Sequence, residues 1–248
     1  MSLDLRLEGS VALITGGTRG VGAGITRTLK RAGARVVTCG RTEPDDPEAE
    51  FLPCDVRDPE QVEQLVDRIV ARFGSLDVLV NNAGGAPYAE VAASSPRLHE
   101  KIVSLNLLAP LYLARQANSV MQHQESGGSI VNISSVSGTR PSPGTASYGA
   151  AKAGLDNLTA TLAVEWAPKV RVNALTVGMV RTEFAATHYP DDSAVARTVP
   201  LGRLAEPEEV GACVAFLASP LASYVSGATL QVHGGGERPP VMYAKEEK

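Results

Sequence analysis

Two kinds of segment alternate along nearly the whole chain, and their order leaves few folds open. Short runs rich in β-branched residues predict seven strands, at residues 11–15, 35–39, 50–54, 78–81, 129–134, 171–176 and 229–232. Stretches with helical periodicity separate them, at residues 22–32, 59–73, 97–122, 148–166 and 208–218, with a further helix possible at 88–94. This alternation favours an α/β fold with a parallel sheet covered on both faces, over a sandwich or a helical bundle.

The chain of 248 residues contains no Pro/Gly/Ser-rich linker and no internal repeat. A doubly wound sheet often uses this length as one unit, so we expect a single domain with its core at about residues 7–235. Residues 42–49 are expected to form a surface turn, and the loop 178–200 is long enough to cover a pocket. The tail 236–248 is expected to be frayed.

Charge and composition exclude several classes of protein. The formal net charge is -4 and no compact Lys/Arg run occurs, which argues against a nucleic-acid partner. The sequence shows neither a signal peptide nor an apolar run of membrane-spanning length, so we expect a cytoplasmic protein. Cys39, Cys54 and Cys213 are expected to be free thiols, and the scattered histidines predict no metal site.

A glycine-rich turn follows the first predicted strand and leads into a helix, with the sequence Thr15-Gly16-Gly17-Thr18-Arg19-Gly20-Val21-Gly22. Glycines allow the backbone to approach a pyrophosphate closely, and the helix N-terminus favours an anion. Turns also use glycine for purely steric reasons, but a strand before and a helix after favour a dinucleotide site.

The end of the second strand indicates which dinucleotide binds. An acidic residue that would hold the ribose hydroxyls is missing there, and Arg41 stands in its place. Arg41 and Arg19 together suit the extra phosphate of NADP(H), so the sequence favours NADP(H) over NAD(H). The alternative is that both arginines are solvated loop residues that bind no cofactor.

Three side chains suggest proton and hydride chemistry. Ser135 ends the fifth strand, and Tyr148 and Lys152 follow at helical i, i+4 spacing, so the last two share one helix face. A nearby ammonium lowers the pKa of a phenol and suits it to acid/base work, while a serine hydroxyl can hold the substrate oxygen. Alone, this spacing also describes a half-buried tyrosine beside a surface lysine.

With these motifs in place, residues 7–235 resemble the short-chain dehydrogenase/reductase family. The markers include the glycine turn, Asn106, Ser135, Tyr148 and Lys152, together with Asp55-Val56 and Asn81-Asn82-Ala83-Gly84. The resemblance implies a Rossmann-type, seven-stranded doubly wound sheet and a homotetramer or homodimer built on helices 97–122 and 148–166.

The resemblance also implies roles for single residues. Asp55 would contact the adenine, Lys152 would hold the nicotinamide ribose, and Asn106 would position a water that relays protons to Lys152. The remaining cofactor contacts are expected from the backbone and side chains of Gly16, Thr18, Arg19, Gly20, Val21, Gly22, Arg41, Val56, Asn82, Ala83, Gly84, Tyr148, Gly178, Val180 and Thr182. Two departures from the family pattern are Val177-Gly178 for Pro-Gly, and His233-Gly234-Gly235 for Asp-Gly-Gly.

The substrate is predicted only as a class: a secondary alcohol or ketone, such as a 3-oxoacyl thioester or a bulky alicyclic or steroid-like compound. The expected pocket walls are Ser137, Gly138, Arg140 and the segments 85–91 and 184–189. Arg140 suits a substrate carboxylate or phosphate, but a solvated loop charge is the commoner role. A non-catalytic dinucleotide sensor and a methyltransferase are the alternative functions.

Overall fold

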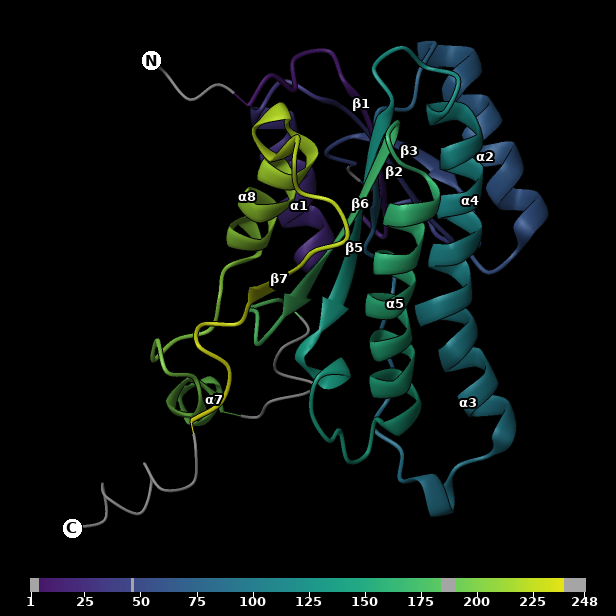
Figure 1. Ribbon diagram of the computed structural model, residues 1–248. Coiled ribbons are helices and arrows are strands. Elements are labelled where there is room, and N and C mark those ends of the chain that lie inside the picture. Colours follow the sequence, from purple (N-terminus) through teal and green to yellow (C-terminus); the bar gives the residue numbers. More distant parts are fainter. Residues whose placement is uncertain (1–4, 46, 184–190, 239–248) are drawn as a thin grey trace.

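A computed structural model describes residues 5–45, 47–183 and 191–238 of the chain. Its centre is one sheet of seven strands in the order β3-β2-β1-β4-β5-β6-β7 (Figure 1). Every neighbouring pair is parallel, which confirms the predicted fold class. The strands are β1 (Val11–Thr15), β2 (Arg35–Gly40), β3 (Glu50–Pro53), β4 (Val78–Asn81), β5 (Gly128–Ser135), β6 (Val170–Val177) and β7 (Thr229–Val232).

Helices cover both faces of this sheet (Figure 1). One face carries α1 (Gly20–Arg31) and α8 (Pro207–Ala218), and the other carries α2 (Pro59–Phe73), α4 (Ala109–Met121) and α5 (Ala146–Glu165). Strand β1 shows why: all of its residues are buried, with Leu13 in the apolar cluster of one face and Ile14 in that of the other. A strand buried on both faces is continuously apolar, which is why these strands appear as unbroken β-branched runs in the sequence.

The order of the strands reverses between β1 and β4, since the chain moves outward to β3 in one direction and to β7 in the other. In open parallel sheets, ligands bind beyond the carboxyl ends of the strands at such a reversal. The glycine turn follows β1, Asn82 follows β4, and Ser135 ends β5. The topology therefore brings the predicted cofactor and catalytic residues to one edge of the sheet.

The predicted helix 97–122 is interrupted in the structure. It consists of α3 (Pro96–Val103), a π-helical turn η2 (Ser104–Leu108) and α4. The possible helix at 88–94 is wrong, because this segment contains only a single 3₁₀ turn, η1 (Val91–Ala93). Two further 3₁₀ turns are η3 (Val136–Gly138) and η4 (Pro220–Ala222).

The predicted loop 178–200 contains a helix, α7 (Asp192–Thr198), so this prediction needs correction. The helix is short and polar, and it begins where the Asp191 side chain accepts a hydrogen bond from the Ser193 amide, 2.8 Å away. Residues 184–190 of the same segment lie outside the described residues.

The tail is not frayed at its start. The Arg238 amide donates to the carbonyl of Thr198 at 2.8 Å, and the Glu237 carboxylate lies 2.6 Å from the Arg140 guanidinium. The rest of the tail, residues 239–248, lies outside the described residues. Within the described part of the chain no helix is both long and apolar enough to cross a membrane, and no His, Cys, Asp or Glu group could hold a metal ion.

Candidate active site

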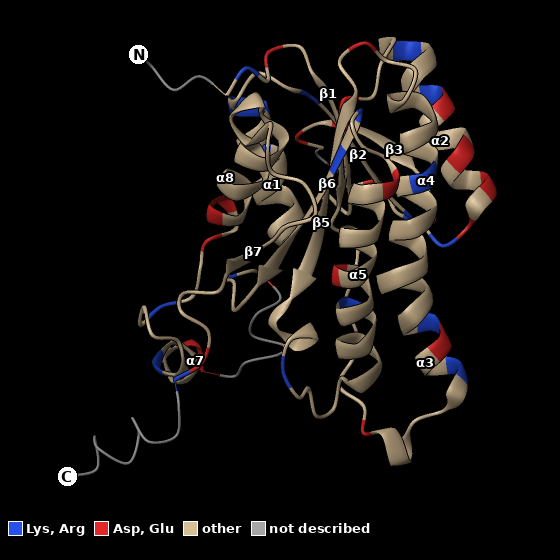
Figure 2. Ribbon diagram, viewed as in Figure 1, with Lys and Arg blue, Asp and Glu red and all other residues tan. Residues whose placement is uncertain are grey.

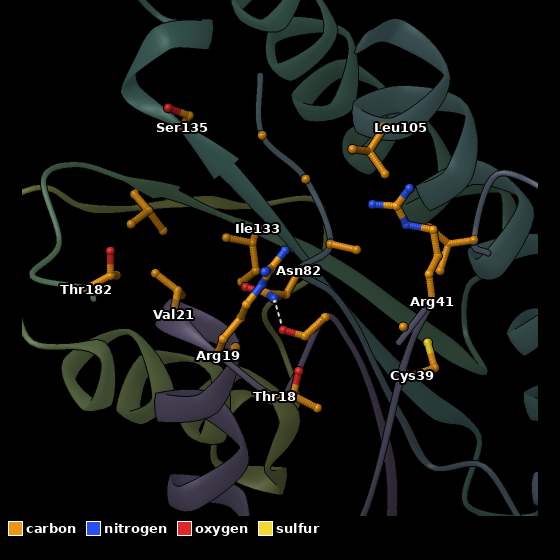
Figure 3. A pocket seen from close by; sticks show the side chains of 18 of the residues that line it. Thr18, Arg19, Val21, Cys39, Arg41, Asn82, Leu105, Ile133, Ser135 and Thr182 are labelled. Carbon is orange, nitrogen blue, oxygen red and sulfur yellow. Dashed lines mark hydrogen bonds between the residues drawn. The ribbon is translucent and has the colours of Figure 1, made fainter. Parts of the chain in front are cut away.

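A cleft of about 810 Å³ opens at the carboxyl ends of the strands (Figure 3). This volume lies within the range of small-molecule and cofactor sites. Most residues that the sequence proposed for the site line it: Gly16, Thr18, Arg19, Val21, Gly22, Arg41, Asp55, Val56, Asn82, Ala83, Gly84, Ser135, Tyr148, Lys152, Gly178, Val180 and Thr182. Gly20 and Asn106 are the two proposed residues outside this lining.

The glycine turn needs its glycines for conformation and for space. Gly16 has a φ of +62°, where side chains are strained, and a Cβ on Gly22 would overlap the Gly16 carbonyl oxygen. Asn82 ties the turn to the end of β4, since its Nδ2 donates to the carbonyl of Thr15 at 2.9 Å and to that of Gly16 at 3.1 Å. Asn82 lies beside the turn in Figure 3. The turn is thus held by the sheet and presents backbone to the cleft, as a pyrophosphate site requires.

Gly20 begins α1, and its amide donates to the Glu183 carboxylate at 2.9 Å. A carboxylate at this position receives the amide hydrogen bond and the favourable helix dipole that a cofactor phosphate would also use. This contact could not be predicted from local sequence patterns, because Glu183 lies in the segment that follows β6, far from Gly20 along the chain.

Three arginines surround the other end of the cleft. The Arg19 and Arg41 side chains extend into it from the glycine turn and from the end of β2 (Figure 3). Arg57 also lines the cleft and holds Asp55 through Nε–Oδ1 (2.9 Å) and Nη2–Oδ2 (2.5 Å) contacts. The hydrogen bond from Arg57 lowers the pKa of Asp55, and Arg41 adds to the effect. Sequence analysis missed Arg57, although its place directly after Asp55-Val56 was a usable signal.

Tyr148 and Lys152 lie on consecutive turns of α5 and both face the cleft. The Lys152 Nζ lies 5.5 Å from the centre of the Tyr148 ring and donates to the Ile133 carbonyl at 2.8 Å. Only 3% of Lys152 is exposed, and this burial lowers its pKa to about 8, against the opposing effect of Asp156. The lysine is therefore an interior group beside the phenol, which argues against a surface lysine with no role.

Ser135 ends β5, and its Oγ accepts a hydrogen bond from the Ser137 amide at 3.2 Å. This contact engages a lone pair of the hydroxyl and not its hydrogen. Ser135 reaches the cleft from the sheet, and Tyr148 reaches it from α5. The structure thus brings Ser135, Tyr148 and Lys152 to the same cavity.

Asn106 is fully buried in the π-helical turn η2. Its Nδ2 donates to the carbonyls of Ile102 and Gly85, and its Oδ1 accepts from the Gly85 amide, all at 2.9 Å. A Cβ added to Gly84 would lie 2.7 Å from the Asn106 Oδ1 and 3.3 Å from the Lys152 Nζ. The Asn106 side chain therefore satisfies backbone groups. Its oxygen and the Lys152 Nζ both lie beside Gly84, which has no side chain to fill the space next to them.

Among the described residues of the expected pocket walls, Gly85 lines the cleft, whereas Ser137, Gly138, Arg140 and residues 86–91 lie outside its lining. The Ala89 amide donates to the Gly144 carbonyl at 2.7 Å, and the Tyr88 ring packs against Gly144, so segment 85–91 meets the loop before α5. Arg140 forms an ion pair with Glu237. The predicted wall at 184–189 lies outside the described residues. The two departures from the family pattern, at Val177-Gly178 and at His233-Gly234-Gly235, are neighbours in the structure, because Gly178 packs directly against His233.

A doubly wound parallel sheet with a glycine turn, an arginine-rich end and a Ser/Tyr/Lys end defines a dinucleotide-dependent oxidoreductase. The known proteins that this chain resembles belong to the same class. A family model described as enoyl-(acyl carrier protein) reductase matches residues 16–237. The cis-4-hydroxycyclohexanecarboxylate dehydrogenase of Sinomonas cyclohexanicum is 40% identical, over 91% of this chain and 95% of its own.

Two further proteins are similar over nearly their full lengths. The 3-oxoacyl-(acyl-carrier-protein) reductase of Vibrio cholerae is 35% identical, over 93% of this chain and 98% of its own. The ligand-free structure of aldohexose dehydrogenase from Thermoplasma acidophilum has a TM-score of 0.88 at 32% identity, over 92% of this chain and 94% of that one.

The chain belongs to the short-chain dehydrogenase/reductase family. It is an NAD(P)-dependent oxidoreductase that acts on a small molecule, and not the sensor or the methyltransferase that the sequence left open.

Proposed function

We propose that this enzyme interconverts a secondary alcohol and a ketone, with Ser135, Tyr148 and Lys152 as its catalytic residues and Asn106 as a positioning residue. The observation that carries the proposal is the convergence of a serine hydroxyl, a phenol and a buried lysine in one cleft. The glycine cradle, which an added Cβ would fill, supports a dinucleotide at the other end.

The chain's own groups perform the proton chemistry. The nicotinamide ring, when bound, supplies or accepts the hydride at the substrate carbon. Ser135 donates a hydrogen bond to the substrate oxygen and orients it, and Tyr148 gives that oxygen a proton in reduction or removes it in oxidation. Lys152 favours the ionised phenol by its charge, and the Asn106 oxygen near it suits a water that returns protons to Lys152.

We propose NADP(H) as the preferred cofactor, with NAD(H) as the alternative. Arg41 stands at the end of β2, where an NAD enzyme would carry an acid, and Arg19 faces the same cleft. The nearby carboxylate of Asp55 is paired with Arg57, which reduces its repulsion of a phosphate.

The proposed substrate is a ketone or alcohol on an alicyclic ring, and the second candidate is a 3-oxoacyl thioester. The dehydrogenase from Sinomonas cyclohexanicum supports the first, since its name specifies a hydroxycyclohexane ring. The Vibrio cholerae reductase supports the second. A panel of cyclohexanones, steroid ketones and 3-oxoacyl thioesters, followed at the absorbance of reduced nicotinamide with NADPH and with NADH, tests both. We expect turnover with NADPH, lost in Ser135→Ala; no turnover of any carbonyl with either cofactor would refute the proposal.

The proposal includes a homotetramer or homodimer built on α4 and α5. Val164 on α5 is 81% exposed, and Leu108, just before α4, is also exposed. Figure 2 shows few charged residues on α4 and α5 compared with α2. Light scattering tests this, with a monomer as the contradicting result. A single domain and a cytoplasmic location stay predictions.

A further inference from the structure

We propose that Arg140 anchors an acidic group of the substrate, and that Glu237 occupies this anchor in the free enzyme. The inference rests on the proposed function, because it specifies the substrate of the same site as a carboxylate-bearing ketone or alcohol.

The loop that carries Arg140 is fixed beside the catalytic groups. It leaves the sheet at Ser135 through η3, and it packs on the turns of α5 that hold Tyr148 and Lys152. A Cβ on Gly138 would lie 2.8 Å from the Ala153 amide nitrogen and 3.2 Å from the Lys152 Cβ. The loop therefore runs from Ser135, which lines the cleft, along the α5 turns of Tyr148 and Lys152 to Arg140, which lies just beyond the residues that line the cleft.

The Arg140 guanidinium is only partly used. Its Nη1 donates to the Pro141 carbonyl at 2.9 Å, and its Nη2 contacts one oxygen of Glu237 at 2.6 Å. Its Nε is buried and has no hydrogen-bond partner among the residues that the structure describes. Nε and Nη2 lie on the same edge of the guanidinium, and such an edge can bind both oxygens of one carboxylate. In this structure Nη2 contacts one oxygen of Glu237, and the donor on Nε is unused.

The bond to Glu237 is of a kind that exchanges readily. The side chains of Arg140 and Glu237 are 32% and 45% exposed, and ion pairs with this exposure contribute little to stability. Replacing Glu237 by a substrate carboxylate keeps the charge of Arg140 compensated, and a bidentate contact would also satisfy the buried Nε.

Glu237 reaches this position from another part of the chain. It follows β7 in a segment anchored by the hydrogen bonds of Leu201 to Gly234 (3.1 Å) and of Arg238 to Thr198 (2.8 Å). These hydrogen bonds hold the backbone on both sides of Glu237 in place. A rotation of the Glu237 side chain is therefore sufficient to move its carboxylate away from Arg140.

Binding measured without turnover tests the inference. Cyclohexanecarboxylate and cyclohexanecarboxamide are titrated by calorimetry into the NADP⁺-saturated enzyme. We expect Arg140→Gln to weaken acid binding about ten- to a hundredfold and to leave amide binding unchanged, with Arg140→Lys in between. Glu237→Gln should tighten acid binding about two- to fivefold. Arg72→Gln, which removes the ion pair of an exposed arginine with the partly buried Glu50, is the control for loss of an arginine–glutamate pair and should change neither.

Equal acid binding by wild type and Arg140→Gln, a parallel loss of acid and amide binding, or no acid binding at all would overturn the inference. Reduction of 4-oxocyclohexanecarboxylate and of its methyl ester by the same proteins separates the two proposals. If neither ketone is reduced but acid binding depends on Arg140, the alicyclic substrate fails and the anchor stands. If both are reduced equally well by wild type and Arg140→Gln, the anchor fails and the function stands.

Discussion

The buried Lys152 makes a prediction about stability that is independent of turnover. Replacing it by methionine keeps an unbranched side chain in the same space and removes the charge. A pKa lowered from 10.5 to about 8 corresponds to about 3 kcal/mol by which the folded protein disfavours the ammonium. The variant also loses the hydrogen bond to Ile133, which costs about 1 kcal/mol. We therefore expect the free energy of unfolding of Lys152→Met to exceed that of the wild type by about 2 kcal/mol at neutral pH.

The gain has a defined dependence on pH. Below pH 8 the lysine is protonated in both the folded and the unfolded protein, so the full penalty on the wild type is present. Between the folded pKa of about 8 and the unfolded value of 10.5, the unfolded chain binds more protons, and the penalty fades as pH rises. The advantage of Lys152→Met should therefore be largest at pH 6.5 and close to zero by about pH 9.5.

Thermal and urea unfolding of the cofactor-free proteins, followed by circular dichroism at both pH values, measure this difference. For a chain of this size, 2 kcal/mol raises Tm by about 4–8 °C. Lys101→Met is the matched control, because Lys101 is exposed and its replacement removes a lysine charge that is not buried. A Lys152→Met protein that is less stable than wild type at pH 6.5, or whose gain is the same at both pH values, would refute the reasoning.

Three further variants test the cofactor end of the cleft. Arg41→Asp should raise KM for NADPH by at least about tenfold and lower KM for NADH, because it removes a guanidinium from the expected 2′-phosphate site and supplies a carboxylate that can hold the ribose hydroxyls; an unchanged cofactor preference would contradict this. Gly22→Ala should weaken NADPH binding about a hundredfold in fluorescence titrations, because its Cβ overlaps the Gly16 carbonyl, and wild-type affinity would show that the turn is not a close-fitting cradle. Glu183→Gln should tighten NADPH binding about two- to fivefold by calorimetry, because it removes the charge that competes for the Gly20 amide, and unchanged or weaker binding would argue against that competition.

Local patterns in the sequence are sufficient to predict the strands of the sheet. The strand β1 was predicted with its observed bounds because both of its faces are buried, which requires an unbroken apolar run. The pairing of Tyr148 with Lys152 was equally local, since their spacing places them on one helix face. The topology of a parallel sheet then brings Ser135 to the same edge.

Contacts between distant segments could not be predicted in this way. The π turn at Asn106 depends on the Gly85 backbone, which the amide side chain meets only in the folded chain. The Gly20–Glu183 and Arg140–Glu237 contacts depend on the paths of loops, and no periodicity reports on these. The helix α7 was missed because its few polar residues carry no apolar stripe.

The proton-transfer role of Tyr148 is tested most directly by Tyr148→Phe, which removes one hydroxyl and keeps the ring. We expect kcat for an accepted ketone to fall by about a thousandfold or more, while NADPH affinity by calorimetry stays within about twofold of wild type. A variant that binds NADPH normally and still turns over at a rate near that of the wild type would contradict the role assigned to this phenol.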